Sequence, residues 1–260
     1  MAQAESFLEL LKIDTDRYNV IAVVGGGGKT SLIYRLNDEL LAMGKKVIIT
    51  TTTHMAYEAR RPFTSCRDME ETDRLIRQYG YVVAAEREES TGKIKALSPE
   101  ILMTLRDHCD VLLIEADGAR QMPLKVPESW EPAIPSIAEL VISVVGLDCL
   151  GKPISETTHR VERTAEFLKK GLDAPVTTED VIKIASSICG LFKNVEDRVY
   201  RVYLNKSDVL SQNEPAEEIL RGLEEQHTVA AYGSLKETCA PDSVSAIEEN
   251  AAEVREARSI

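Results

Sequence analysis

The chain has 260 residues, of which 43% are hydrophobic and 28% charged, which is the composition of a folded protein with a sizeable core. Its 43 acidic residues outnumber 31 basic ones, and the net charge of -12 disfavours nucleic acid or an anionic membrane as a partner. Because residues 1–16 lack a basic segment before a long apolar core, and no apolar run is long enough to span a membrane, we expect a cytoplasmic protein.

The chain begins with a predicted short amphipathic helix at residues 5–11 and ends with a predicted charged helix at residues 242–257. Between them, apolar β-branched runs predict strands at residues 20–24, 46–50, 81–85, 111–115, 140–145, 199–204 and 228–231. Apolar residues three to four apart, as in residues 32–41 and 181–188, predict crossover helices. This alternation predicts an α/β fold of the P-loop NTPase kind, with a mostly parallel sheet and helices on both faces.

No repeat or linker divides the sequence, so we predict one domain over residues 1–260 with a proline-rich insertion at about residues 118–137. Four prolines there exclude a helix or a central strand, so the insertion is either a structural loop or a functional flap. The five cysteines form no C-x-x-C pair and the four histidines have no H-E-x-x-H spacing. We therefore expect reduced thiols and no dedicated transition-metal site.

A glycine-rich run separates the first main strand from its helix: Gly25, Gly26, Gly27, Gly28, Lys29, Thr30 and Ser31. Strand, glycine loop and helix in this order predict a phosphate-binding loop, in which backbone N–H groups and Lys29 bind phosphates and Thr30 binds Mg²⁺. Val23 stands where the usual G-x-x-x-x-G-K-[ST] pattern has its first glycine, which suggests a shorter loop. The alternative is a glycine-rich turn followed by an incidental Lys-Thr pair.

Residues 111–115 end in Glu115, and Asp117 follows two residues later. Carboxylates at the carboxyl end of a buried strand predict a Walker B element that holds Mg²⁺ and orients the attacking water. The sequence leaves open which of the two carboxylates serves, and an Asp-Gly turn leaving the strand is the alternative.

Asn205, Lys206 and Asp208 match the N-K-x-D pattern of guanine specificity, and Ser234 lies in the loop after the next predicted strand. A carboxylate at Asp208 accepts hydrogen bonds from guanine N1–H and its amine, so GTP is favoured over ATP.

Thr53 and His54 directly follow the second main strand, where a switch segment commonly reaches the γ-phosphate. The alternative is that they are β-branched residues at a strand end and a surface histidine without a function. Four more basic residues are candidates for binding an anionic substrate or a partner, although each alone is more often a solvated surface residue: Arg120, Lys125, His159 and Arg160.

These motifs together resemble the YqeC family of accessory proteins for selenium-dependent molybdenum hydroxylases. The resemblance rests on GGGGKTS at Gly25, TTTTHM at Thr50, EADGARQMPLKVP at Glu115, EPAIP at Glu131, VVGLDCLGKPI at Val144, HRVE at His159 and LNKSD at Leu204. It implies a cytoplasmic role in maturing a molybdenum and selenium cofactor. Trp130 departs from the family pattern, which has a histidine before the glutamate.

The leading interpretation is a Mg²⁺-dependent P-loop protein that hydrolyses GTP or ATP and acts with a molybdenum hydroxylase or one of its maturation proteins, with Lys29, Thr30, Thr53, Glu115 and Asp117 at its centre. A P-loop kinase for a small molecule is an alternative, with Arg60, Arg61 and Arg120 as candidate lid residues. A non-catalytic, nucleotide-gated carrier or scaffold is another.

Overall fold

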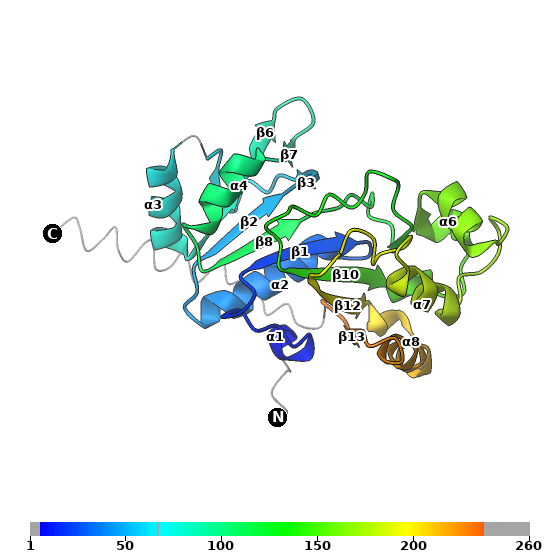
Figure 1. The fold of residues 1–260 in the computed structure, drawn as a ribbon. Coiled ribbons are helices and arrows are strands. Elements are labelled where there is room, and N and C mark those ends of the chain that lie inside the picture. Colours follow the sequence, from blue (N-terminus) through cyan, green and yellow to red (C-terminus); the bar gives the residue numbers. More distant parts are fainter. Residues whose placement is uncertain (1–5, 67, 237–260) are drawn as a thin grey trace.

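The computed structural model describes residues 6–66 and 68–236, and one parallel sheet with eight strands runs through its centre (Figure 1). The strands lie in the order β13-β12-β10-β1-β8-β2-β5-β4. Their bounds are β1 Val20–Gly25, β2 Val47–Thr51, β4 Phe63–Thr64, β5 Tyr81–Ala84, β8 Val111–Glu115, β10 Leu140–Gly146, β12 Val199–Asn205 and β13 Val229–Gly233. All seven predicted strands are therefore confirmed, and β4 is an additional short edge strand.

The sheet is apolar on both faces because helices cover both. Every residue of the central strands β1, β8 and β10 is buried, which explains their nearly continuous hydrophobic sequences. On one face, Ile21 and Val23 of β1 pack in a cluster with the helices at residues 7–10 and 29–42. On the other, Val20 and Val24 pack in a cluster with the helices at residues 69–79, 99–106, 178–186 and 214–224. The predicted α/β fold, with a mostly parallel sheet covered on both faces, is confirmed.

Local sequence signals mark the ends of some of the helices. Their bounds are α1 Phe7–Leu10, α2 Lys29–Ala42, α3 Met69–Tyr79, α4 Pro99–Arg106, α5 Ile154–Thr157, α6 Val161–Leu168, α7 Thr178–Ser186 and α8 Glu214–Glu224, with 3₁₀ turns η1 Leu147–Cys149 and η2 Ser207–Val209. Helix α7 begins with a capping box between Thr177 and Asp180, and α3 ends at Gly80 in the left-handed conformation. The predicted helix at residues 242–257 lies outside the described residues.

Two small sheets were not predicted from the sequence. Strands β3 (His54–Ala56), β6 (Glu86–Glu88) and β7 (Lys93–Lys95) form an antiparallel sheet, and β9 (Leu124–Lys125) pairs in parallel with β11 (Thr158–His159). These strands have two or three residues each and many charged side chains, so their sequences carry no strand signal. They matter for the site because β3, β9 and β11 each contain one of its predicted residues.

The proline-rich insertion at residues 118–137 is bonded to the carboxyl edge of the main sheet. Met122 O accepts a hydrogen bond of 3.0 Å from Gly27 N, and Pro123 O accepts one of 2.9 Å from Gly146 N. Further along, Ala133 O accepts a bond of 2.7 Å from the Thr52 hydroxyl. The insertion thus lies against the glycine loop, at the edge where parallel α/β sheets place their ligands.

Candidate functional site

The glycine loop connects the end of β1 to the start of α2. Gly26 N donates to Val144 O at 2.8 Å, and Gly27 N donates to Met122 O, so these two amides point into the protein. The next amides belong to the N-terminal end of α2, which begins at Lys29. The first N–H groups of a helix have no partner within the helix, and the helix dipole makes this end favourable for anions.

Glycine is required in this loop because other backbone segments approach it closely. A Cβ atom on Gly25 would lie 2.4 Å from Val144 O, and one on Gly27 would lie 2.3 Å from Gly146 N. Both glycines also have positive φ angles, of +90° and +76°. The loop is therefore packed between β10 and the proline-rich insertion, and a side chain at either position would push them apart.

Lys29 folds back over the loop, where its Nζ donates a 2.9 Å hydrogen bond to Gly25 O. The side chain is buried, with 7% of the residue exposed. Burial lowers the pKa of Lys29, and the neighbouring carboxylates of Glu115 and Asp117 oppose this shift. A negatively charged ligand at the end of α2 would stabilise the charged form of this lysine.

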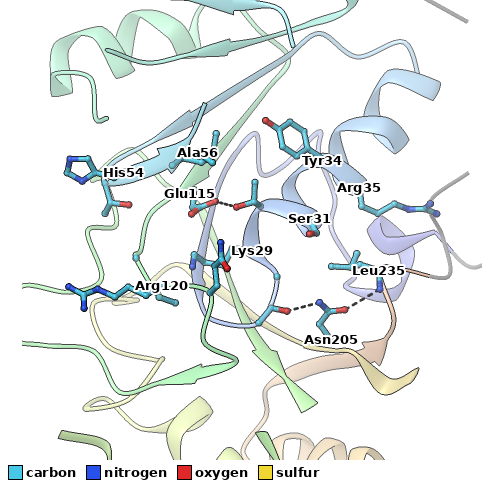
Figure 2. Close-up of a pocket in the computed structure, with 18 of the residues that line it drawn as sticks. Lys29, Ser31, Tyr34, Arg35, His54, Ala56, Glu115, Arg120, Asn205 and Leu235 are labelled. Carbon is cyan, nitrogen blue, oxygen red and sulfur yellow. Dashed lines mark hydrogen bonds between the residues drawn. The ribbon is translucent and has the colours of Figure 1, made fainter. Parts of the chain in front are cut away.

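Thr30 and Glu115 face each other across the junction of α2 and β8. The Thr30 hydroxyl donates a 2.6 Å hydrogen bond to Glu115 Oε2, which Figure 2 shows as a dashed line. Glu115 is positioned there because β8 pairs with β1, with Glu115 opposite Val23. Burial raises the pKa of Glu115, although Lys29 and the Thr30 hydroxyl favour its charged form. Such a pair of oxygens beside the glycine loop is suited to a hard cation.

Asp117 has different partners from Glu115. Its Oδ2 accepts a 3.2 Å bond from Gly25 N and its Oδ1 a 2.7 Å bond from Lys125 Nζ. Lys125 is fully buried and also donates to Gly118 O at 2.7 Å. Burial raises the pKa of Asp117, and the charge of Lys125 opposes the shift. Asp117 therefore anchors the glycine loop to the proline-rich insertion through a buried ion pair.

Two further charged residues, Glu131 and Arg160, connect the buried pair of Asp117 and Lys125 to the surface of the site. Lys125 Nζ lies 3.0 Å from Glu131 Oε2, and the other oxygen of Glu131 accepts a 3.0 Å bond from Arg160. The Arg160 guanidinium in turn lies 5.8 Å from the centre of the Trp130 ring. We refer to this series from Asp117 through Lys125, Glu131 and Arg160 as the charge chain.

A large cleft of about 1630 Å³ lies over the glycine loop. Fifteen of the candidate residues named from the sequence line it: Gly27, Gly28, Lys29, Thr30, Ser31, Thr53, His54, Arg61, Glu115, Arg120, His159, Arg160, Asn205, Lys206 and Ser234. Six do not: Gly25, Gly26, Arg60, Asp117, Lys125 and Asp208. In Figure 2, Asn205 and Leu235 lie on one side of Lys29, whereas Arg120 and His54 extend on the other.

The N-K-x-D residues lie beside the glycine loop at the ends of β12 and β13. Asn205 Nδ2 donates to Gly27 O at 2.7 Å, and Asn205 Oδ1 accepts from Leu235 N at 3.2 Å (Figure 2). Lys206 Nζ pairs with Asp148 Oδ2 at 2.7 Å, and Asp208 Oδ2 lies 3.8 Å from Lys236 Nζ. Asn205 thus connects the glycine loop to the loop that contains Ser234.

The switch candidates Thr53 and His54 line the cleft, as do three of the four basic candidates, all but the buried Lys125. Thr53 N donates to the Thr51 hydroxyl at 3.0 Å, and that hydroxyl donates to Glu115 O at 2.8 Å. These bonds connect the segment of Thr53 to the end of β8. Burial, together with the positive charges of Lys125 and Arg160, lowers the pKa of His159 to about 4. His159 is therefore neutral at pH 7.

The candidate lid arginines are separated by the structure. Arg61 lines the cleft and stacks on Tyr34 at 3.3 Å from the ring centre, and it pairs with Glu58 at 2.6 Å. Arg60 is exposed and does not line the cleft. Arg120, the other candidate, lines the cleft at the end away from Asn205 (Figure 2).

Sequence reasoning missed several residues that line the cleft, among them Tyr34, Asp38 and Glu131 in a binding role. Tyr34 and Asp38 lie four and eight residues after Thr30 on α2. This spacing places them on the same helix face as Thr30, so helical periodicity alone was a usable signal. Glu131 gave no such signal, because its position depends on the path of the proline-rich insertion.

Within residues 6–66 and 68–236, no three His, Cys, Asp or Glu side chains are grouped to hold a metal ion by themselves. A magnesium site in this part of the chain would thus need ligand oxygens in addition to protein ones, as Mg²⁺ sites at nucleotides commonly do. No helix among the described residues is both long and apolar enough to cross a membrane.

Comparison with known proteins assigns the family. The sequence model of the YqeC protein family matches residues 21–162. The chain belongs to the YqeC family. The uncharacterized protein YqeC of Escherichia coli (strain K12) is 38% identical over 222 residues, which cover 83% of this chain and 86% of that protein. The family resemblance of the motifs is therefore confirmed.

Two solved structures are similar at a lower level. The hydrogenase maturation factor HypB from Archaeoglobus fulgidus is 14% identical, with a TM-score of 0.39, over 95% of this chain and 92% of its own. An apo-form GTPase from Pyrococcus abyssi is 16% identical, with a TM-score of 0.39, over 90% of this chain and 96% of its own. At these values neither likeness carries a conclusion about the site.

Proposed function

We propose that this YqeC protein binds a magnesium nucleoside triphosphate in the cleft and hydrolyses it. The observation that carries the proposal is the contact between Thr30 and Glu115. A hydroxyl in the first turn of α2, beside Lys29, lies 2.6 Å from a carboxylate at the end of the neighbouring strand. This combines a phosphate-binding loop and a Walker B carboxylate at one point.

In this proposal, the phosphates lie at the N-terminal end of α2. The amides from Gly28 to Ser31 and the Lys29 ammonium bind their oxygens, and the buried, partly neutralised environment strengthens these contacts. Lys29 moves from Gly25 O to the phosphates, a short change because both lie against the same loop.

Thr30 and Glu115 fit the requirements of a magnesium site. Their two side-chain oxygens lie 2.6 Å apart, and they would hold Mg²⁺ together with phosphate oxygens and water. The ion would neutralise phosphate charge when bound. Of the two candidate carboxylates, we assign Glu115 to the metal, because both oxygens of Asp117 have protein donors.

The base is placed at the other end of the nucleotide, toward Asn205, Lys206, Asp208 and Ser234. A guanine there would supply two N–H donors to the Asp208 carboxylate, which does not line the cleft itself but lies 3.8 Å from the Nζ of Lys236, a residue that does. Asn205 already bonds both the phosphate loop and the loop after β13. This arrangement supports GTP over ATP.

Family membership supports a role for this activity as an accessory step in the maturation of a selenium-dependent molybdenum hydroxylase or its cofactor in the cytoplasm. Hydrolysis then resets a conformational state of the protein. Residues 118–137 and the segment of Thr53 and His54 are the candidate switch segments, since both contact the β8 strand end or the phosphate loop.

Calorimetry with GTP and ATP, with and without Mg²⁺, tests the proposal directly. We expect tighter binding of GTP that depends on Mg²⁺, and phosphate release that needs no added acceptor. Glu115→Gln should remove the Mg²⁺ dependence, and the exposed Glu89→Gln should not. Turnover only with an added small-molecule acceptor would instead identify a kinase, binding without turnover a carrier, and absence of nucleotide binding would refute the proposal.

A further inference from the structure

The cleft is larger than a single nucleotide site requires. Ligand pockets commonly enclose about 300–1,000 Å³, whereas this cleft encloses about 1630 Å³. If the nucleotide base lies toward Asn205, as in the proposed function, the end around Arg120 and His54 stays outside the nucleotide (Figure 2). This end therefore has room for a second molecule next to the terminal phosphate.

An exposed indole forms one wall of this end. Trp130 is the single tryptophan of the sequence, it lines the cleft, and 68% of it is exposed. Large exposed aromatic rings inside clefts commonly bind planar ligands by stacking. The Arg160 guanidinium lies 5.8 Å from the ring centre and keeps a cation beside this surface.

The same end carries positive charge that the protein does not neutralise. In the charge chain, the two carboxylates Asp117 and Glu131 balance Lys125 and Arg160. Arg120 adds a further charge, and no carboxylate of the described residues lies within ion-pair distance of it. In a chain with a net charge of -12, such a local excess of positive charge marks a site for an anion.

Unsatisfied polar atoms point to the same conclusion. Among the described residues, His159 Nδ1 and Arg160 Nε are buried and have no hydrogen-bond partner. Both residues line the cleft. Buried polar groups are normally paired, so each of these two residues at the cleft has an unused capacity for a further hydrogen bond.

We propose that Trp130, Arg120, His159 and Arg160 form a second ligand site, for a small anion that carries a planar ring. The ring stacks on Trp130, and its phosphate or carboxylate group binds the guanidiniums of Arg120 and Arg160. The charge chain holds Arg160 in place from beneath, since Glu131 bonds both Arg160 and the buried Lys125. A small molecule fits better than a protein partner because all four residues line the cleft.

Calorimetry with 1-naphthyl phosphate and 1-naphthoate tests this site and separates phosphate from carboxylate ligands. At least one of them should bind with one-to-one stoichiometry and at least about fivefold more tightly than inorganic phosphate or 1-naphthol, because ring and anion both contribute. Binding should persist when a non-hydrolysable GTP analogue and Mg²⁺ saturate the nucleotide site. If no nucleotide binds, the same titration without the analogue still measures the second site, so the two proposals fail separately.

Variants identify the residues. Arg120→Gln should weaken binding about tenfold, and Trp130→Ala should reduce the preference for naphthyl over inorganic phosphate. Trp130→Phe keeps a ring and should retain most of the affinity, and Arg60→Gln, an exposed arginine outside the cleft, should bind like the wild type. Three results would overturn the proposal: competition by the GTP analogue, failure of both naphthyl compounds to bind, or wild-type affinity in both Arg120→Gln and Trp130→Ala.

Discussion

Replacing Glu131 by glutamine removes the carboxylate that joins Lys125 to Arg160 and should destabilise the protein by an amount that depends on pH. Burial by itself raises the pKa of Glu131, but hydrogen bonds from Arg160, from the Glu128 backbone and from Lys125 outweigh it, and the pKa falls from 4.5 to about 2. A difference of that size corresponds to about 3 kcal/mol of stability near neutral pH.

The sign of the pH dependence follows from the lowered pKa in the folded state. The stabilisation is fully present above the unfolded pKa of 4.5 and is lost as the pH falls toward about 2. Linkage between these two values predicts that about 2 kcal/mol of the stability difference between wild type and Glu131→Gln disappears between about pH 7 and pH 3. Other carboxylates titrate in both proteins and cancel in this difference.

Urea unfolding of both proteins at several pH values between 7 and 3 measures the effect. Glu89→Gln, at an exposed position, serves as the matched control and should show no pH-dependent difference from the wild type. If the difference between wild type and Glu131→Gln is the same at pH 7 and pH 3, the ionised carboxylate of Glu131 does not stabilise the fold and the reasoning about the charge chain is wrong.

Four further predictions concern the site. Lys125→Met should lower the free energy of unfolding by about 3–5 kcal/mol, measured by urea unfolding, because it leaves the Asp117 carboxylate buried without its cation. The double variant Lys125→Met, Asp117→Asn should lose less stability than the single variant, because it removes the unpaired carboxylate as well. Lys29→Ala should abolish triphosphate binding in calorimetry while circular dichroism stays unchanged. Glu115→Gln should remove the increase in nucleotide affinity that Mg²⁺ causes in the wild type, and an increase of the same size in the variant would exclude a role of Glu115 at the metal. Asp208→Ala should weaken GTP roughly tenfold or more and leave ATP unaffected in the same titrations.

The main sheet could be predicted from the sequence because its strands are buried on both faces. The run from Val20 to Val24 is apolar at every position, and the other central strands are apolar apart from Ser143 in β10 and the terminal Glu115 of β8, so hydrophobicity and spacing identified all of them. The glycine loop was recognisable for a related reason. Its sequence occurs between a strand and a helix, and each glycine that packs against another backbone segment had to be a glycine.

The choice between the two carboxylates could not be predicted, because it depends on contacts between distant segments. Glu115 and Asp117 are equally acidic and two residues apart, yet one faces Thr30 and the other faces Lys125. The pairing of β9 with β11 places Lys125 opposite His159, although 34 residues separate them in the sequence. Two-residue strands carry no periodicity, so the sequence gives no sign of that pairing.

The hydrogen bond from Gly27 N to Met122 O has a consequence for how the protein would respond to a ligand. It joins the glycine loop to the proline-rich insertion through main-chain atoms, so the connection does not depend on a side chain of either segment. A shift of the loop would therefore move the insertion directly, or else break the bond and expose the amide to solvent. The deuterium exchange rate of the Gly27 amide accordingly reports, at a single position, whether the two segments move together or separate.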